Sequence, residues 1–145
     1  MQREIEFRGV RKYPMSEWLY GDLSHVDGDT YIFPLYGMNS PDYYEVIPET
    51  VSQYIGFKDI NGVKIYEGSI IRWDDLTNGD RWRVAVVELY PSLQFRIIKI
   101  ECDFKQSGKE GSIFSFSNFM YKEIHKHIEI IGNIHTDKNI LTANK

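Results

Sequence analysis

The chain has 145 residues, of which 42% are hydrophobic and 26% are charged, and its formal net charge is −4. This composition is typical of one ordinary globular domain, and the acidic balance disfavours a nonspecific nucleic-acid binder, which normally carries a basic face. The sequence shows no signal-peptide pattern, no apolar run of the ~18 residues that span a bilayer, and one cysteine, Cys102, so we expect a cytoplasmic protein without membrane contact or an internal disulfide.

Extended segments and turns alternate through the first third of the chain. Apolar and charged residues alternate over residues 5–8 until Gly9, which is the pattern of a strand with one exposed face. Asp27-Gly28 is a turn signal, because both residue types tolerate a positive φ. We expect strands over residues 5–8, 17–20, 30–33 and 43–47, and a helical turn over residues 50–55.

The clearest local signal follows in the centre of the chain. Asn61-Gly62 separates two β-type segments, and this pair predicts a type I′ hairpin turn, in which both central residues have a positive φ. Near-helical spacing of apolar residues predicts a short helix over residues 113–124, with Ser115 or Ser117 as its cap. We expect further strands over residues 57–60, 63–66, 69–73, 81–90, 93–104 and 127–134.

Many short strands with one late helix predict a mainly β architecture, a small barrel or roll. The aromatic content of 14% favours the same class, because aromatic side chains suit half-buried pleated surfaces. We expect one domain over residues 1–145, in which an N-terminal β-rich segment, residues 1–47, packs on a barrel formed by residues 48–140.

Three stretches of the chain resemble the YopX-like family of phage and prophage proteins. The N-terminal stretch is R-E-I-E-F-R-G at residues 3–9 with E-W-L-Y-G at 17–21. The central one is V-I-P-E-T-V-S-Q-Y-I-G-F-K-D-I-N-G-V-K-I-Y-E-G-S-I-I at residues 46–71, and the last is I-E-I-I-G-N-I at 128–134. These stretches lie at the start, middle and end, so the resemblance covers nearly the whole chain.

The resemblance implies an SH3-type barrel and a phage or prophage origin, hence the cytosol of a host cell. It implies no activity and no site residues. One departure is Ser69, which stands where the family usually has an aspartate. A serine hydroxyl can still accept a backbone hydrogen bond, so a structural role at this position survives, whereas a role that requires negative charge does not.

An aromatic segment is the first candidate site. Pro34, Gly37 and Pro41 interrupt it, so one small core cannot enclose every ring, and exposed rings commonly mark a protein contact. The segment also lies in the acidic part of the chain, since residues 1–47 hold 4 Lys/Arg and 8 Asp/Glu, a balance of −4. The candidate protein-contact residues are Tyr31, Phe33, Tyr36, Tyr43 and Tyr44.

A second candidate is a nucleic-acid surface on a hairpin, formed by Arg72, Arg81 and Arg83 with the neighbouring tryptophans. Small barrels bind single strands through aromatic platforms and a cationic groove. Against this, Trp82 alternates in step with Val84 and Val86, which places it toward the core. The arginines then form an exposed face or pair with nearby aspartates.

A third candidate is a metal site at His125, His127 and His135, whose even spacing would place the rings on one face of a strand unless Gly132 breaks the register. Asp59, Glu67, Asp74 and Asp75 could form carboxylate pairs, but Asp59 and Glu67 flank turns, where acidic residues commonly stabilise the turn. We find no catalytic motif and expect no cofactor.

The sequence therefore favours a noncatalytic accessory protein that binds a protein partner or itself, with a homodimer through residues 30–47 as one form of this hypothesis. The alternatives are a small nucleic-acid-binding barrel and a small metal-dependent enzyme.

Overall fold

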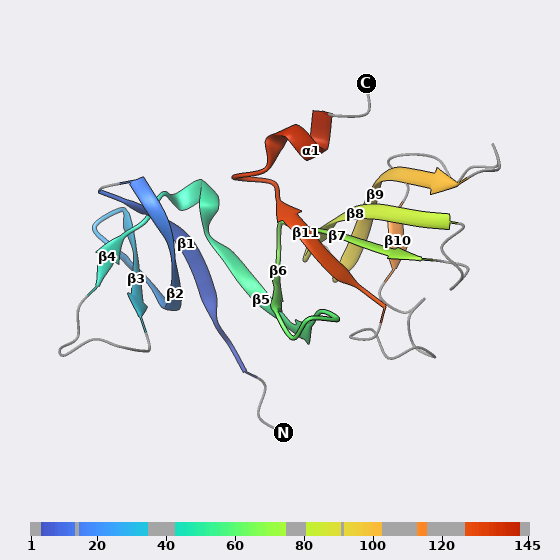
Figure 1. The fold of residues 1–145 in the computed structure, drawn as a ribbon. Helices are drawn as coiled ribbons and strands as arrows, with labels where there is room; N and C mark the ends of the chain where they lie inside the picture. Colours follow the sequence, from blue (N-terminus) through green and yellow to red (C-terminus); the bar gives the residue numbers. More distant parts are fainter. Residues whose placement is uncertain are drawn as a thin grey trace. The chain divides into compact units, whose positions relative to one another are not determined.

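The structure is a computed structural model that describes residues 4–13, 15–34, 43–74, 81–90, 92–102, 113–115 and 127–142. Within these ranges it describes the backbone alone for residues 15–16, 81, 99–102, 114–115 and 141–142. The described strands pair in two antiparallel sheets, one of six strands and one of five (Figure 1).

The six-stranded sheet has the order β4-β3-β2-β1-β5-β6. Its strands are β1 (Phe7–Lys12), β2 (Met15–Val26), β3 (Asp29–Pro34), β4 (Tyr44–Glu45), β5 (Ser52–Lys58) and β6 (Lys64–Tyr66). A short 3₁₀ helix, Pro48–Thr50, precedes β5. The expected helical turn over residues 50–55 is therefore wrong: the turn lies earlier, at Pro48, whose fixed φ suits a helix start, and β5 follows it.

The five-stranded sheet has the order β10-β9-β8-β7-β11. Its strands are β7 (Ser69–Asp74), β8 (Arg81–Glu88), β9 (Gln94–Cys102), β10 (Ile113–Ser115) and β11 (Glu129–Asn133), and the helix α1 (Lys138–Thr142) follows β11. The expected helix over residues 113–124 is wrong at its start, because Ile113–Ser115 pair with β9 as a strand. The remainder of that prediction lies outside the described residues.

The chain divides into two compact units, Met1–Gly56 and Phe57–Lys145, and their boundary falls inside β5. In the first unit, Ile32 and Val46 are fully buried. A Cβ atom at Gly9 would lie 3.1 Å from the Cβ of Val46. Gly9 thus lets β1 pass close to Val46, and β1 continues through it to Lys12, so the expected strand end at Gly9 is wrong.

The second unit has apolar residues on both faces of its sheet. One face carries six residues that are at most 2% exposed: Ile71, Trp73, Ala85, Val87, Phe95 and Ile97. The rings of Trp73 and Phe95 meet edge to face, with centroids 5.9 Å apart. On the other face Ile134 and Ile140 help to cover a cluster of Ile70, Val84 and Val86. A sheet covered on both faces explains why these strands read as nearly continuous apolar runs.

The mainly β prediction is confirmed, but the described strands do not form a closed barrel. Each sheet has two edge strands, β4 and β6 in one and β10 and β11 in the other. An SH3-type topology and the packing of residues 1–47 on residues 48–140 stay predictions.

Two hairpin turns differ from each other in an informative way. Asp27 and Gly28 both have a positive φ, +51° and +85°, between the paired residues Val26 and Asp29, which is the type I′ geometry. At the second turn Gly62 has a φ of +78° but Asn61 has no positive φ. The Gly62 N–H donates to the Asp59 carbonyl at 3.0 Å, and the Asp59 N–H donates to the Val63 carbonyl at 2.8 Å. The expected hairpin is present, but its turn is type I followed by a left-handed glycine.

Candidate protein-contact surface

The candidate aromatic residues gather on one face of the β3–β4 edge of the first unit. Tyr31 and Phe33 alternate along β3 with the buried residue Ile32, so both project to the face opposite Ile32. Tyr43 precedes β4 and covers them: its ring centroid lies 5.3 Å from that of Tyr31 and 5.2 Å from that of Phe33. Tyr43 as a residue remains 57% exposed, so this three-ring cluster presents an aromatic surface to solvent.

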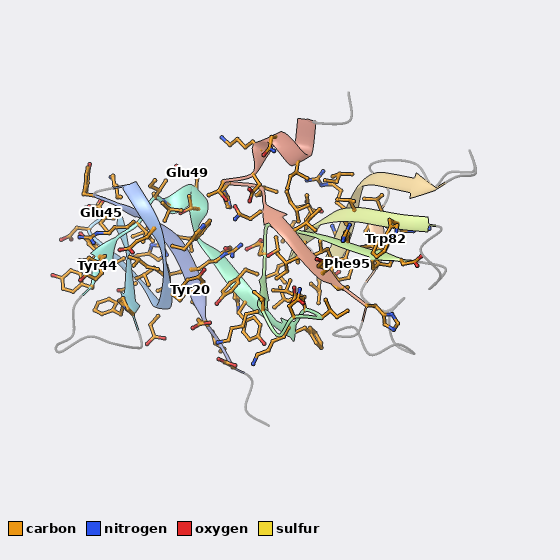
Figure 2. The ribbon with its side chains drawn as sticks, in the orientation of Figure 1. Tyr20, Tyr44, Glu45, Glu49, Trp82 and Phe95 are labelled. Atoms are coloured by element: carbon orange, nitrogen blue, oxygen red, sulfur yellow. The ribbon has the colours of Figure 1, made fainter. Side chains whose placement is uncertain are left out.

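The structure does not bring all five candidates together. Tyr44 is paired with Ile32, so it lies on the opposite face from Tyr43, where the Arg11 guanidinium stacks 4.4 Å from its ring centroid. Figure 2 shows Tyr44 and Glu45 on β4, at the outer edge of the first unit. Tyr36 lies outside the described residues.

Acidic side chains border the three rings. Asp29 is on the same face of β3 as Tyr31 and Phe33, and Asp22 of β2 is directly opposite Phe33. Glu45 of β4 is directly opposite Tyr31, and its Oε2 atom accepts a hydrogen bond of 2.8 Å from the Lys12 ammonium. We call the six residues that share this side of the sheet the aromatic–acidic face: Asp22, Asp29, Tyr31, Phe33, Tyr43 and Glu45.

Electrostatics on this face favour positive charge. Partial burial raises the pKa of the Tyr31 phenol above its ordinary value of 10.0, and the nearby charges of Asp29 and Glu45 raise it further. The hydrogen bond and charge of Glu45 likewise raise the pKa of Lys12 above 10.5. Both pKa values are raised in part by nearby negative charge, which opposes tyrosinate and favours ammonium.

Sequence reasoning found the rings but missed their acidic border. The signal was present in Asp29-x-Tyr31-x-Phe33, because residues two apart in a strand share a face. Asp22 could not be found in this way, since its place opposite Phe33 depends on the register that the Asp27-Gly28 turn sets between β2 and β3.

The candidate nucleic-acid residues do not form one described surface. Arg72 and Trp82 lie on one face of the second sheet, and Arg83, directly opposite the buried Trp73, lies on the other. The Arg72 guanidinium stacks 4.8 Å from the Trp82 ring centroid and forms an ion pair of 2.9 Å with Glu129. For Arg81 the structure describes the backbone alone. The register also places Trp82 on the same face as Val84 and Val86, as expected, although the tryptophan is half-buried rather than buried.

His127 and His135 do not share one regular strand, as the Gly132 signal indicated. The β7–β11 register shifts between Ile130 and Gly132, and His135 lies beyond the strand, where its backbone N–H donates to the Asn133 side chain at 2.9 Å. His127 precedes the strand, and His125 lies outside the described residues. Across the described ranges, no three His, Cys, Asp or Glu side chains are grouped so as to hold a metal ion.

Asp59, a candidate carboxylate, acts as a structural acceptor. Its carboxylate is buried, and one oxygen, Oδ1, accepts hydrogen bonds of 2.9 Å from the N–H groups of Asn61 and Val63. The other oxygen, Oδ2, accepts from the Ile130 N–H of β11 at 3.1 Å. Ser69 has a comparable role, since its buried hydroxyl accepts a 3.2 Å hydrogen bond from the Tyr66 N–H. Asp75 lies outside the described residues.

These observations define a mainly β protein of two open sheets with an aromatic–acidic face at one sheet edge. No helix in the described part of the chain has the length and apolar character that a membrane crossing requires. A family model described as YopX protein matches residues 7–142. The chain therefore belongs to the YopX family. It matches no curated protein.

Proposed function

We propose that this YopX-family chain is a noncatalytic protein-binding module whose contact surface is the aromatic–acidic face. The observation that carries the proposal is the three-ring cluster of Tyr31, Phe33 and Tyr43, in which the residue Tyr43 is 57% exposed. Solvated aromatic rings are energetically unfavourable, and aromatic residues are enriched at protein interfaces. A phage accessory role in the host cytosol and an SH3-type architecture are the context that the resemblance implies for this module.

The position of the rings supports the same function. β4 has only two residues, and directly after it Val46 bridges to Arg11 of β1 and the Ile47 N–H donates to the Val10 carbonyl at 2.9 Å. Because β1 already binds the backbone there, a partner would contact the rings with its side chains. The other candidates receive less support, because Arg72 is already paired with Glu129 and Asp59 with backbone N–H groups.

Affinity capture with matched variants tests the proposal. Tyr43→Ser removes the outermost ring of the cluster, whereas Tyr90→Ser removes an 86% exposed tyrosine of the second unit and is the control. The wild-type chain and both variants are immobilised in equal amounts and exposed to a lysate of host cells, and the retained proteins are quantified by mass spectrometry. We expect Tyr43→Ser to lose at least one partner that Tyr90→Ser retains. Identical retention by all three proteins would refute the proposed surface.

A further inference from the structure

We propose that the aromatic–acidic face recognises a cationic protein segment, in which arginine side chains stack on the rings and pair with Asp22 and Asp29. This inference rests on the proposed function and names the chemistry of the partner.

The charge of the face is the first argument. Its three carboxylates, Asp22, Asp29 and Glu45, are accompanied by two described cations, Lys12 and Arg8, which is directly opposite Tyr20 of β2. Lys12 is bound to Glu45 at 2.8 Å and is also influenced by the charge of Asp29, whereas the Nε of Arg8 donates to the Ser52 hydroxyl. The excess of carboxylates leaves the face negatively charged, so it attracts a positively charged partner and repels a negative one.

The position of those carboxylates is the second argument. Asp29 lies two residues before Tyr31 on the same face of β3, and Asp22 is directly opposite Phe33, so each carboxylate flanks a different ring of the cluster. A guanidinium group can stack on an aromatic ring while it donates hydrogen bonds in its own plane to a carboxylate. The chain itself uses the stacking half of this arrangement twice nearby, with Arg11 on Tyr44 at 4.4 Å and Arg8 on Trp18 at 4.5 Å.

The same charges argue against a second copy of this chain as the occupant. In a symmetric dimer one patch contacts the identical patch of the other subunit. Two copies of the aromatic–acidic face would bring Asp22 and Asp29 of one copy close to those of the other. Like charges at an interface are unfavourable, so a homodimer through residues 30–47 would have to neutralise these carboxylates by other groups. A cationic partner would neutralise them itself.

The test uses a short peptide with alternating arginine and glycine and its counterpart with citrulline, which has the shape of arginine without the charge. Binding to the full chain is followed by amide NMR shifts at low salt and at 300 mM salt. We expect the arginine peptide to shift residues 22, 29, 31, 33 and 43, the citrulline peptide to shift none of them, and salt to weaken the binding. The double variant Asp22→Asn/Asp29→Asn should weaken arginine-peptide binding roughly threefold to tenfold. Glu49→Gln, which removes an exposed carboxylate of the 3₁₀ helix, should leave it unchanged.

Each contrary result has a distinct meaning. Equal binding of the citrulline peptide, or full binding by the double variant, overturns the cationic segment. Sedimentation that shows a dimer in the wild type and a monomer in Tyr43→Ser identifies the occupant as a second copy and also overturns it. If no arginine peptide binds but Tyr43→Ser still loses a captured protein, the cationic inference fails and the proposed function stands. If capture is unaffected by Tyr43→Ser, the proposed function itself fails.

Discussion

Gly62 shows how one residue can be required for its backbone conformation alone. Its φ is +78°, and a Cβ atom added there would meet nothing within 4 Å. Steric crowding therefore does not oppose a larger residue, but a β-branched side chain resists a positive φ. We expect Gly62→Val to reduce the free energy of unfolding by about 1–2 kcal/mol or more, measured by urea denaturation.

Gly62→Asn is the matched control, because asparagine enters the left-handed region more readily than valine. It should retain most of the stability that Gly62→Val loses. Equal stability of Gly62→Val and the wild type would mean that the turn has a different backbone from the one described.

Tyr31 provides a pH-dependent prediction. Since burial and the charges of Asp29 and Glu45 raise its pKa, the phenol contributes stability that is present below pH 10.0 and is lost as the pH rises through the higher pKa of the folded state. In a ¹³C NMR titration of ring-labelled tyrosines, the signal absent from Tyr31→Phe should titrate above pH 10.0. Asp29→Asn should lower that pKa, and a Tyr31 signal that titrates at or below the ordinary value would contradict the environment described here.

At the scale of elements, Asp59 connects the β5–β6 hairpin with β11. Three backbone N–H groups, of Asn61, Val63 and Ile130, donate to its two oxygens. A buried backbone donor left unsatisfied costs about 1–3 kcal/mol, and water can reach the turn of Asn61 and Val63, which are exposed residues. We therefore expect Asp59→Ala to lower the free energy of unfolding by about 1–3 kcal/mol in denaturant titrations.

Asp59→Asn keeps one oxygen and replaces the other with an NH₂ group, which cannot accept. The free energy of unfolding that Asp59→Asn loses should therefore lie between zero and the loss caused by Asp59→Ala. If Asp59→Ala were as stable as the wild type, the carboxylate would not stabilise the junction of the hairpin and β11.

The sequence allowed the hairpins to be predicted but did not determine their geometry. Asn61-Gly62 suits both a type I′ turn and a type I turn followed by a left-handed glycine, and the Asp59 carboxylate, which binds the Asn61 and Val63 N–H groups, accompanies the second. The helix expected over residues 113–124 failed at its start because pairing with β9 overrides weak helical spacing. The helix α1 was missed because its five residues are too few for a recognisable period, although Asp137 directly before it was an available start signal.

At the scale of the whole molecule, periodicity predicts strands without predicting which strands pair. The mainly β class followed from local patterns, whereas the two open sheets depend on contacts between distant residues, such as Ile71 with Ile130. The boundary between the compact units could not be predicted either, because it falls within β5, beside Gly56, whose φ is +96°. A glycine in a strand predicts a bend or bulge, but it does not predict that a second compact unit begins there.

The histidines give a prediction for the folded chain as a whole. The register shift at Gly132 and the place of His135 beyond β11 prevent His127 and His135 from sharing one continuous strand face. We expect dialysis against a chelator to leave the melting temperature unchanged. A clear fall in melting temperature that zinc reverses would show that these histidines bind a metal that stabilises the fold.

The two oxygens of Asp59 also have a consequence for the order of folding. Oδ1 binds donors that are 2 and 4 residues away in the chain, whereas Oδ2 binds a donor 71 residues away. Closing a long loop costs more entropy than closing a short one, so local contacts form first. We infer that the hairpin forms first, with hydrogen bonds to Oδ1 of Asp59 only. The hydrogen bond from Ile130 to Oδ2 then forms when β11 pairs with the sheet. Mutation of Ile130 would then accelerate unfolding more than it slows folding, whereas mutation at the turn would affect the folding rate.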